Sequence, residues 1–129
     1  MRRHVAISGT GRAGTTFLVE LLTELGLDTG FSGDQASRLP PTSFGGLEHD
    51  IRDSAAPYIV KSPWLCEYID EVIDAEEIIL EHIIIPIRSL EDAAESRRRV
   101  SALGGAVGGL WRTKSSSEGV QERILAHQL

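Results

Sequence analysis

A glycine-rich segment near the start of the chain carries the residues best suited to bind an anion. Residues 9–16 read GTGRAGTT and lie between an apolar run and an amphipathic stretch. Backbone N–H groups at the start of a helix are unpaired and lie at the positive end of the helix dipole, so they attract phosphate. Gly9 and Gly14 fit the phosphate-binding pattern G-x-x-x-x-G-K, but Thr15 stands where that pattern has lysine. The cation of this segment is instead Arg12, which lies between the glycines.

A second pair of candidate binding residues lies near another apolar run, 82–87. Arg88 follows that run directly, and Ser96 comes eight positions later, about two turns into the next expected helix. An arginine can bind an oxyanion through two parallel hydrogen bonds, and a serine hydroxyl can add another. The pair could hold a second phosphate, although it also suits an exposed arginine and an ordinary helical serine. The basic run 97–99 is interpreted as an exposed helix face.

Apolar runs alternate with helical patterns along the chain. The patterns predict strands over 3–8, 58–61 and 82–87, the last of them buried, and helices over 15–25, 64–75, 89–103 and 118–128. The apolar positions of the first helix predict its buried face: Phe17, Leu18, Leu21, Leu22 and Leu25. This order predicts an α/β fold with a parallel sheet flanked by helices, and ligands at the carboxyl ends of the strands. The irregular segment 28–56 is interpreted as a substrate-facing insertion.

Length and charge limit the classes of protein that the chain can belong to. Its 129 residues suit a single domain over 1–129, and its formal net charge of −6 argues against binding nucleic acid through a general basic surface. One cysteine, Cys66, excludes an internal disulfide. No apolar run approaches the ~20 residues of a membrane span, and the run after residues 1–3 is too short for a signal peptide. We therefore expect a cytoplasmic protein that neither spans a membrane nor binds nucleic acid.

The two motifs together resemble those of the sulfotransferases that use 3′-phosphoadenylyl sulfate (PAPS). The 5′-phosphosulfate loop of that family has Lys or Arg, a small residue, Gly, Thr, Thr and an aromatic residue or Leu, which residues 12–17 match position by position. Its 3′-phosphate motif has an Arg at a strand end and a Ser eight residues later, as at Arg88 and Ser96. The segment 61–63, Lys-Ser-Pro, is similar to one that many members carry after the second strand. The resemblance covers roughly residues 3–100 and implies a P-loop NTPase-like three-layer sandwich.

The resemblance implies a role for each matched residue. The 5′-phosphosulfate would be held by the loop residues Ala13, Gly14, Thr15 and Thr16. Arg12 would neutralise charge on the bridging oxygen as the sulfuryl group leaves, because such transfer depends mainly on positioning and on stabilising the leaving anion. Arg88 and Ser96 would bind the 3′-phosphate. Phe17 could support the adenine, and a place in the core is an equally good interpretation.

The acceptor group needs a base to take its proton. Some family members use a His directly after the Lys-Thr pair that follows the second strand, but Pro63 stands at that position. Other members use a Glu between the first helix and the second strand, which favours Glu48, with His49 as the second candidate. Both residues also suit a solvated loop. Lys61 could contact the leaving phosphate or the acceptor, although a lysine at a strand end is often simply exposed.

These expectations amount to a metal-independent, PAPS-dependent sulfotransferase. It would act on a hydroxyl or an amine of a small-molecule or glycan acceptor and release adenosine 3′,5′-bisphosphate. The family's later element with further 3′-phosphate contacts has no counterpart after 112–114, so we expect a truncated or minimal member, and a homo-oligomer is one hypothesis for what covers that side. Two alternatives stay open: a P-loop kinase or NTPase, which needs the Walker lysine, and a catalytically silent nucleotide-binding module.

Overall fold

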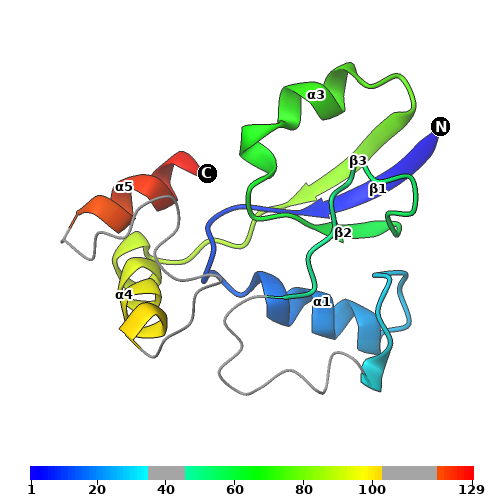
Figure 1. The fold of residues 1–129 in the computed structure, drawn as a ribbon. Helices are drawn as coiled ribbons and strands as arrows, with labels where there is room; N and C mark the ends of the chain where they lie inside the picture. The colour runs from blue at the N-terminus through cyan, green and yellow to red at the C-terminus, as the bar shows by residue number, and fades with distance from the viewer. Residues whose placement is uncertain (35–45, 103–118) are drawn as a thin grey trace.

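The computed structural model describes residues 1–34, 46–102 and 119–129 (Figure 1). The elements in chain order are β1 (Arg2–Ile7), α1 (Thr15–Glu24), β2 (Ile59–Lys61), the short 3-10 helix η1 (Leu65–Glu67), α3 (Ile69–Asp74), β3 (Ile78–Ile84), α4 (Leu90–Ala102) and α5 (Val120–His127). The centre of the predicted insertion and the residues between α4 and α5 lie outside the described residues. Among the described helices, none is long and apolar enough to cross a membrane.

The three described strands form a parallel sheet in the order β2-β1-β3. Ile7 at the end of β1 pairs with Lys61 on one side and with Ile84 on the other. The carboxyl ends of the strands therefore lie together, on the side of the sheet where α4 and α5 are found (Figure 1). The predicted α/β class and the parallel sheet are confirmed.

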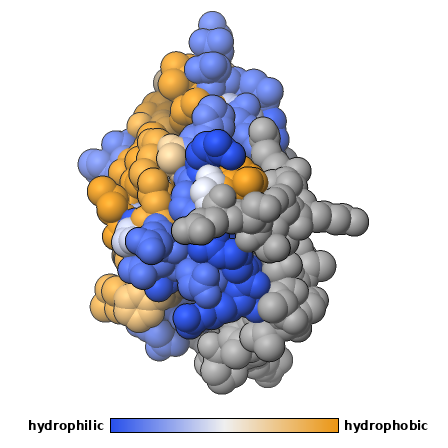
Figure 2. All heavy atoms as spheres, turned by 90° about the vertical axis from the view of Figure 1, so that its left-hand side faces the viewer, coloured by the Kyte–Doolittle hydropathy of each residue, from blue (hydrophilic) through white to orange (hydrophobic). Residues whose placement is uncertain are grey.

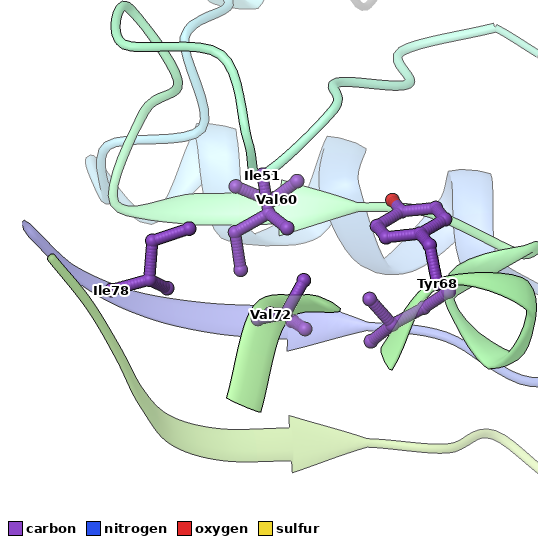
Figure 3. Close-up of a cluster of buried hydrophobic side chains, with 7 residues drawn as sticks. Ile51, Val60, Tyr68, Val72 and Ile78 are labelled. Carbon is purple, nitrogen blue, oxygen red and sulfur yellow. The ribbon is translucent and has the colours of Figure 1, made fainter. Parts of the chain in front are cut away.

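Alternate residues of β1 face two different cores, and helices α1 and α3 lie on opposite sides of the sheet (Figure 1). The core on the α1 side consists of Val5, Ile7, Val19 and Ile59. The core on the α3 side consists of Ala6, Ile51, Val60, Leu65, Tyr68, Val72 and Ile78 (Figure 3). Because β1 is central and alternates between the two cores, it fixes the start of the loop that follows it.

The buried face of α1 differs from the one that its apolar spacing predicts. Three of the five apolar residues are exposed, Phe17, Leu21 and Leu25, with exposed fractions of 63%, 41% and 66%. The buried side chains include Val19 and Thr23 instead. The Thr23 hydroxyl donates to the Val19 carbonyl oxygen at 2.7 Å and lies 2.6 Å from the hydroxyl of Thr29. The prediction is correct for Leu18 and Leu22, which pack against the α1-side core, and wrong for the three exposed residues. Apolar periodicity cannot register threonines whose hydroxyls find partners inside the fold.

β3 also differs from the buried strand expected over 82–87. It begins at Ile78, ends at Ile84, and forms one edge of the described sheet. Its isoleucines at 79, 83 and 84 are exposed, as are those at 85 and 87 beyond its end. A run of isoleucines is typical of a strand that is covered on both faces. The expectation of burial is wrong within the described residues, because the neighbours of a strand are set by tertiary structure and not by its own sequence.

Local chemistry explains where several helices begin and end. The Ser89 hydroxyl accepts the N–H of Asp92 at 3.3 Å, which confirms the predicted N-cap of α4. Gly26, with φ of 78°, follows the end of α1 as expected. The predicted helix over 64–75 is interrupted at Tyr68, where φ is −138° and the phenol oxygen lies 2.7 Å from the hydroxyl of Ser62.

We expect Ile51→Ala to lower the free energy of unfolding by about 2–5 kcal/mol, because Ile51 is completely buried in the α3-side core. Urea unfolding followed by circular dichroism measures the loss. The matched control is Ile73→Ala, since Ile73 is 69% exposed and its truncation should change stability by less than about 0.5 kcal/mol. Equal losses in the two variants would contradict the assigned core.

Candidate anion-binding site

The β1–α1 loop, residues 8–14, contains three residues with left-handed backbone conformation. These are Gly9, Arg12 and Gly14, with φ of 101°, 72° and 92°. For Arg12 this conformation costs about 1–3 kcal/mol, and such strain is concentrated at functional sites. Gly14 is the N-cap of α1, and its first-turn N–H groups receive no side-chain cap from the described residues. The loop therefore leads into a helix N-terminus that is suited to an anion.

Arg12 links this loop to α4 and to Arg88, which lies four residues beyond the end of β3 at Ile84 and not directly after the strand as expected. Its Nε donates to the Ser96 hydroxyl at 3.0 Å, and the Arg88 Nη1 donates to the Arg12 carbonyl oxygen at 3.2 Å. The structure thus brings together the two motifs that are separate in the sequence. Burial lowers the pKa of Arg12, and the nearby charge of Arg88 lowers it further. Like charges held this close create a local potential that favours an anion.

Arg97 is a further cation of this region that sequence reasoning assigned to an exposed face. Arg97 is only 3% exposed, and its Nη2 lies 3.0 Å from the position that a Cβ on Gly11 would take. Its Nη1 donates to the Gln121 side-chain oxygen at 3.4 Å. Burial and the charge of Arg12 lower the pKa of Arg97 to about 10. The exposed-face interpretation is correct for Arg99 and wrong for Arg97, because a run of like residues does not show which one turns inward.

Lys61 is buried at the end of β2 and holds three segments together. Its side chain is 1% exposed, and its Nζ lies 2.8 Å from the Thr16 hydroxyl, 2.5 Å from the Gly46 carbonyl oxygen and 2.8 Å from the Glu48 Oε1. These three acceptors match the three N–H donors of an ammonium group. Burial lowers the pKa of Lys61, and the bond to Glu48 opposes that effect. In this arrangement Lys61 positions the start of α1 against the segment 46–48.

The two candidate bases, Glu48 and His49, point to different places. The Glu48 Oε1 accepts the N–H of Gly46 at 2.9 Å in addition to the bond from Lys61. The His49 ring lies 4.8 Å from the ring of Phe31, and its backbone N–H donates to the Lys61 carbonyl oxygen at 3.1 Å. Of these two side chains, that of Glu48 reaches the residues around the β1–α1 loop, because it bonds to Lys61, which also bonds to Thr16.

Helix α5 reaches the same loop through a residue that carries no distinctive sequence signal. The Gln128 Oε1 accepts the N–H of Gly11 at 3.3 Å, and its Nε2 donates to the Pro63 carbonyl oxygen at 3.3 Å. One buried amide thus bridges the segments that follow β1 and β2. Gln121 is also buried and lies seven positions earlier, on the same face of α5. A buried glutamine looks like any surface glutamine in the sequence, which is why this contact escaped prediction.

The other loop residues differ in their exposure. Thr15 is buried at the start of α1, Ala13 is partly buried, and Phe17 is exposed one position beyond Thr16. The exposure of Phe17 excludes its alternative place in the core. Thr10, which sequence reasoning did not select, is buried, and its hydroxyl has no hydrogen-bond partner among the described residues.

The region around the β1–α1 loop is locally cationic, although the chain carries a net charge of −6. Figure 2 shows the side of the molecule where α4 and α5 lie, and a polar band crosses it beside an apolar patch.

Over residues 1–34, 46–102 and 119–129, no group of three or more His, Cys, Asp or Glu residues is arranged to hold a metal ion. In comparisons with known proteins, no family model, no curated protein and no solved structure matches the chain.

We expect Lys61 and Glu48 to be energetically coupled. Glu48→Gln leaves a buried ammonium without its counter-charge and should cost about 2–4 kcal/mol, and Lys61→Met should cost a similar amount. The double variant should lose about 1–3 kcal/mol less than the sum of the two single losses, which lies within the usual range for contacting pairs. Urea unfolding of the four proteins gives the coupling energy.

The exposed pair Arg99–Glu95 supplies the control cycle, because both side chains are largely in water. Its coupling should be about 0.3–0.5 kcal/mol. A coupling of that small size for Lys61 and Glu48 would show that their contact is not a buried ion pair.

Proposed function

We propose that the chain binds PAPS and transfers its sulfuryl group to a hydroxyl or amine acceptor, on a P-loop NTPase-like α/β sandwich. The observation that carries this proposal is the meeting of two motifs. Arg12 bonds to Ser96 across 84 residues of sequence, and Arg88 bonds to Arg12 across 76. They meet beyond the carboxyl ends of parallel strands, where α/β folds bind their ligands.

In this proposal the two phosphate groups are bound by different parts of the site. The loop and the first turn of α1 hold the 5′-phosphosulfate, and an oxygen of that group would give the buried Thr10 hydroxyl a partner. Arg88 and Ser96 hold the 3′-phosphate. A serine hydroxyl that accepts from Arg12 can still donate its own proton to a phosphate oxygen. The exposed Phe17 ring supports the adenine.

The transfer step uses Arg12 and Glu48. The acceptor oxygen or nitrogen attacks sulfur, the bond from sulfur to the bridging oxygen breaks, and its electron pair stays on the 5′-phosphate. The acceptor proton passes to the Glu48 carboxylate, so the products are the sulfated acceptor and adenosine 3′,5′-bisphosphate. Arg12 stabilises the charge that develops on the leaving phosphate. Lys61 positions both Glu48 and Thr16 for this step.

A catalytically silent nucleotide-binding module is the second candidate function. One observation favours it: the Glu48 Oε1 already receives bonds from Lys61 and from Gly46. The kinase or NTPase alternative has less support for two reasons. Thr15 stands at the position of the Walker lysine, and Arg88 stands after β3 where such enzymes usually have an acid that holds Mg²⁺. Sulfate transfer from PAPS to a panel of acceptors separates the enzyme from the silent module.

Arg88→Ala should weaken adenosine 3′,5′-bisphosphate binding by about 10- to 100-fold, because a charge-assisted hydrogen bond is lost. Binding of adenosine 5′-monophosphate, which lacks the 3′-phosphate, should change little. Isothermal titration calorimetry with both nucleotides measures the difference. Arg99→Ala is the matched control, since it also removes an arginine, and Arg99 is an exposed residue of α4.

Two results would count against the proposal. An equal loss for both nucleotides in Arg88→Ala would remove Arg88 from the 3′-phosphate site. Binding of ATP–Mg²⁺ by the unmodified chain, with no response to the bisphosphate, would favour the kinase or NTPase alternative and overturn the sulfotransferase proposal.

A further inference from the structure

We infer that Gln128 is a positioning residue of the anion site. Its side-chain amide holds the β1–α1 loop in the conformation that binds an anion, and it fixes that loop against the segment that follows β2. The inference deepens the proposed function and rests on it only in part, because it requires an anion in the loop and not a nucleotide. Gln128 belongs to neither of the two motifs that the sequence shows.

The Gln128 amide joins two segments at the point where β1 and β2 have ended. At the strand ends, the two segments still bond directly, since the Ser62 N–H donates to the Ile7 carbonyl oxygen at 2.9 Å. Farther along, the Gln128 Oε1 accepts the N–H of Gly11, and its Nε2 donates to the carbonyl oxygen of Pro63, each at 3.3 Å. A glutamine side chain carries the same acceptor and donor as a peptide group, so it can serve both backbones.

The amide is buried, and its partners fix its orientation. Gln128 is only 3% exposed and directly follows the end of α5, on the side where the strands end (Figure 1). The Gly11 N–H can only donate and the Pro63 carbonyl oxygen can only accept, so a rotated amide would lose both hydrogen bonds. Leu125, which is completely buried against α4, sets the position of this end of the helix.

The bond to Gly11 acts directly before a strained residue. Arg12 has a φ of 72°, and such left-handed strain persists only where the surrounding contacts fix it. The loop then continues to Gly14, the N-cap of α1. Because Gln128 holds the backbone at the start of this turn, the loop is formed before an anion arrives. A preformed loop loses less conformational freedom on binding, which strengthens binding.

The bond to Pro63 connects the loop to the other half of the proposed reaction. Lys61 lies two positions before Pro63, and its ammonium group bonds to the Glu48 carboxylate at 2.8 Å. Gln128 thus fixes the loop relative to the segments that carry the proposed base. Since group transfer depends on the alignment of the reacting groups, α5 would control that alignment without touching the substrate.

The first measurement is backbone amide hydrogen exchange, followed by NMR without a ligand. Gln128→Met removes both hydrogen bonds at a similar side-chain size, so the Gly11 amide should exchange roughly 10-fold faster relative to a reference amide in the sheet. The reference is Val5, whose N–H donates to the Tyr58 carbonyl oxygen at 2.8 Å. An unchanged ratio of the two rates would mean that the substitution only weakens the whole fold, and it would overturn the inference.

A second variant separates the two halves of the amide. The carboxylate of Gln128→Glu can accept the Gly11 N–H but cannot donate to Pro63, so the Gly11 amide should exchange within about 3-fold of its rate in the unmodified chain. This variant decides the matter if Gln128→Met does not fold. Exchange at Gly11 that is roughly 10-fold faster in Gln128→Glu would contradict the assigned bond.

The third measurement is calorimetric binding of adenosine 3′,5′-bisphosphate, adenosine 5′-monophosphate and inorganic pyrophosphate. Gln128→Met should weaken every one of these that binds by the same factor, about 3- to 10-fold, because it acts on the loop and not on one phosphate group. His127→Met is the matched control, since His127 is exposed at the end of α5 and should not affect binding. Equal affinities in the two variants would overturn the inference.

The two proposals fail in different ways. A chain that binds pyrophosphate with the predicted dependence on Gln128, and does not bind the bisphosphate, keeps this inference and rejects the sulfotransferase proposal. A chain that binds the bisphosphate equally well with glutamine and methionine at position 128 keeps the nucleotide site and rejects the inference. A chain that binds neither pyrophosphate nor the nucleotides rejects both.

Discussion

Burial of positive charge beside one backbone loop is the constraint on which the site depends. Arg97 and Lys61 are almost completely removed from water, and Arg12 is partly removed, at the point where β1 leads into α1. Only a matching arrangement of acceptors makes such burial tolerable. Lys61 has three acceptors, among them the carboxylate of Glu48, and this set ties the start of α1 to the segment before β2.

The arginines are arranged differently from Lys61. Their hydrogen bonds include ones to neutral groups: the Ser96 hydroxyl, the Arg12 carbonyl oxygen and the Gln121 amide. Lys61 thus holds segments around β2 together, whereas the arginines connect the β1–α1 loop to α4 and to the segment after β3, and α4 to α5. Strain at Arg12, in left-handed conformation, falls on the second group.

The sheet explains why these groups can meet. In a parallel sheet, the segments that follow β1, β2 and β3 all emerge at one edge. The loop, the Lys61 contact and Arg88 come from those three segments, and α4 and α5 close the same region through their own small apolar contact of Ala93, Ala94 and Leu125. Helix α5 then adds Gln128, whose single amide joins the segments after β1 and β2.

The features of the fold and of the candidate site that depend on residues close together in the sequence could be predicted. Glycines at fixed spacing after an apolar run marked the loop, Ser89 marked the start of α4, and the alternation of strand and helix patterns marked a parallel α/β sheet. The eight-residue spacing of Arg88 and Ser96 is also a property of the chain alone, and in the structure each of the two bonds to Arg12. The sequence did not show that Phe17 and Leu21 are exposed, nor that β3 is an edge strand among the described residues.

By itself, then, the sequence determined the turn, the starts of α1 and α4 and the chemical types of the candidate binding residues, because these depend on neighbours along the chain. Tertiary structure alone decided which arginine of the run 97–99 turned inward, which acid reached Lys61, and which glutamine reached the loop. Burial and charge pairing depend on groups brought together from distant parts of the chain, and identical residue types give no sign of that difference until the chain has folded.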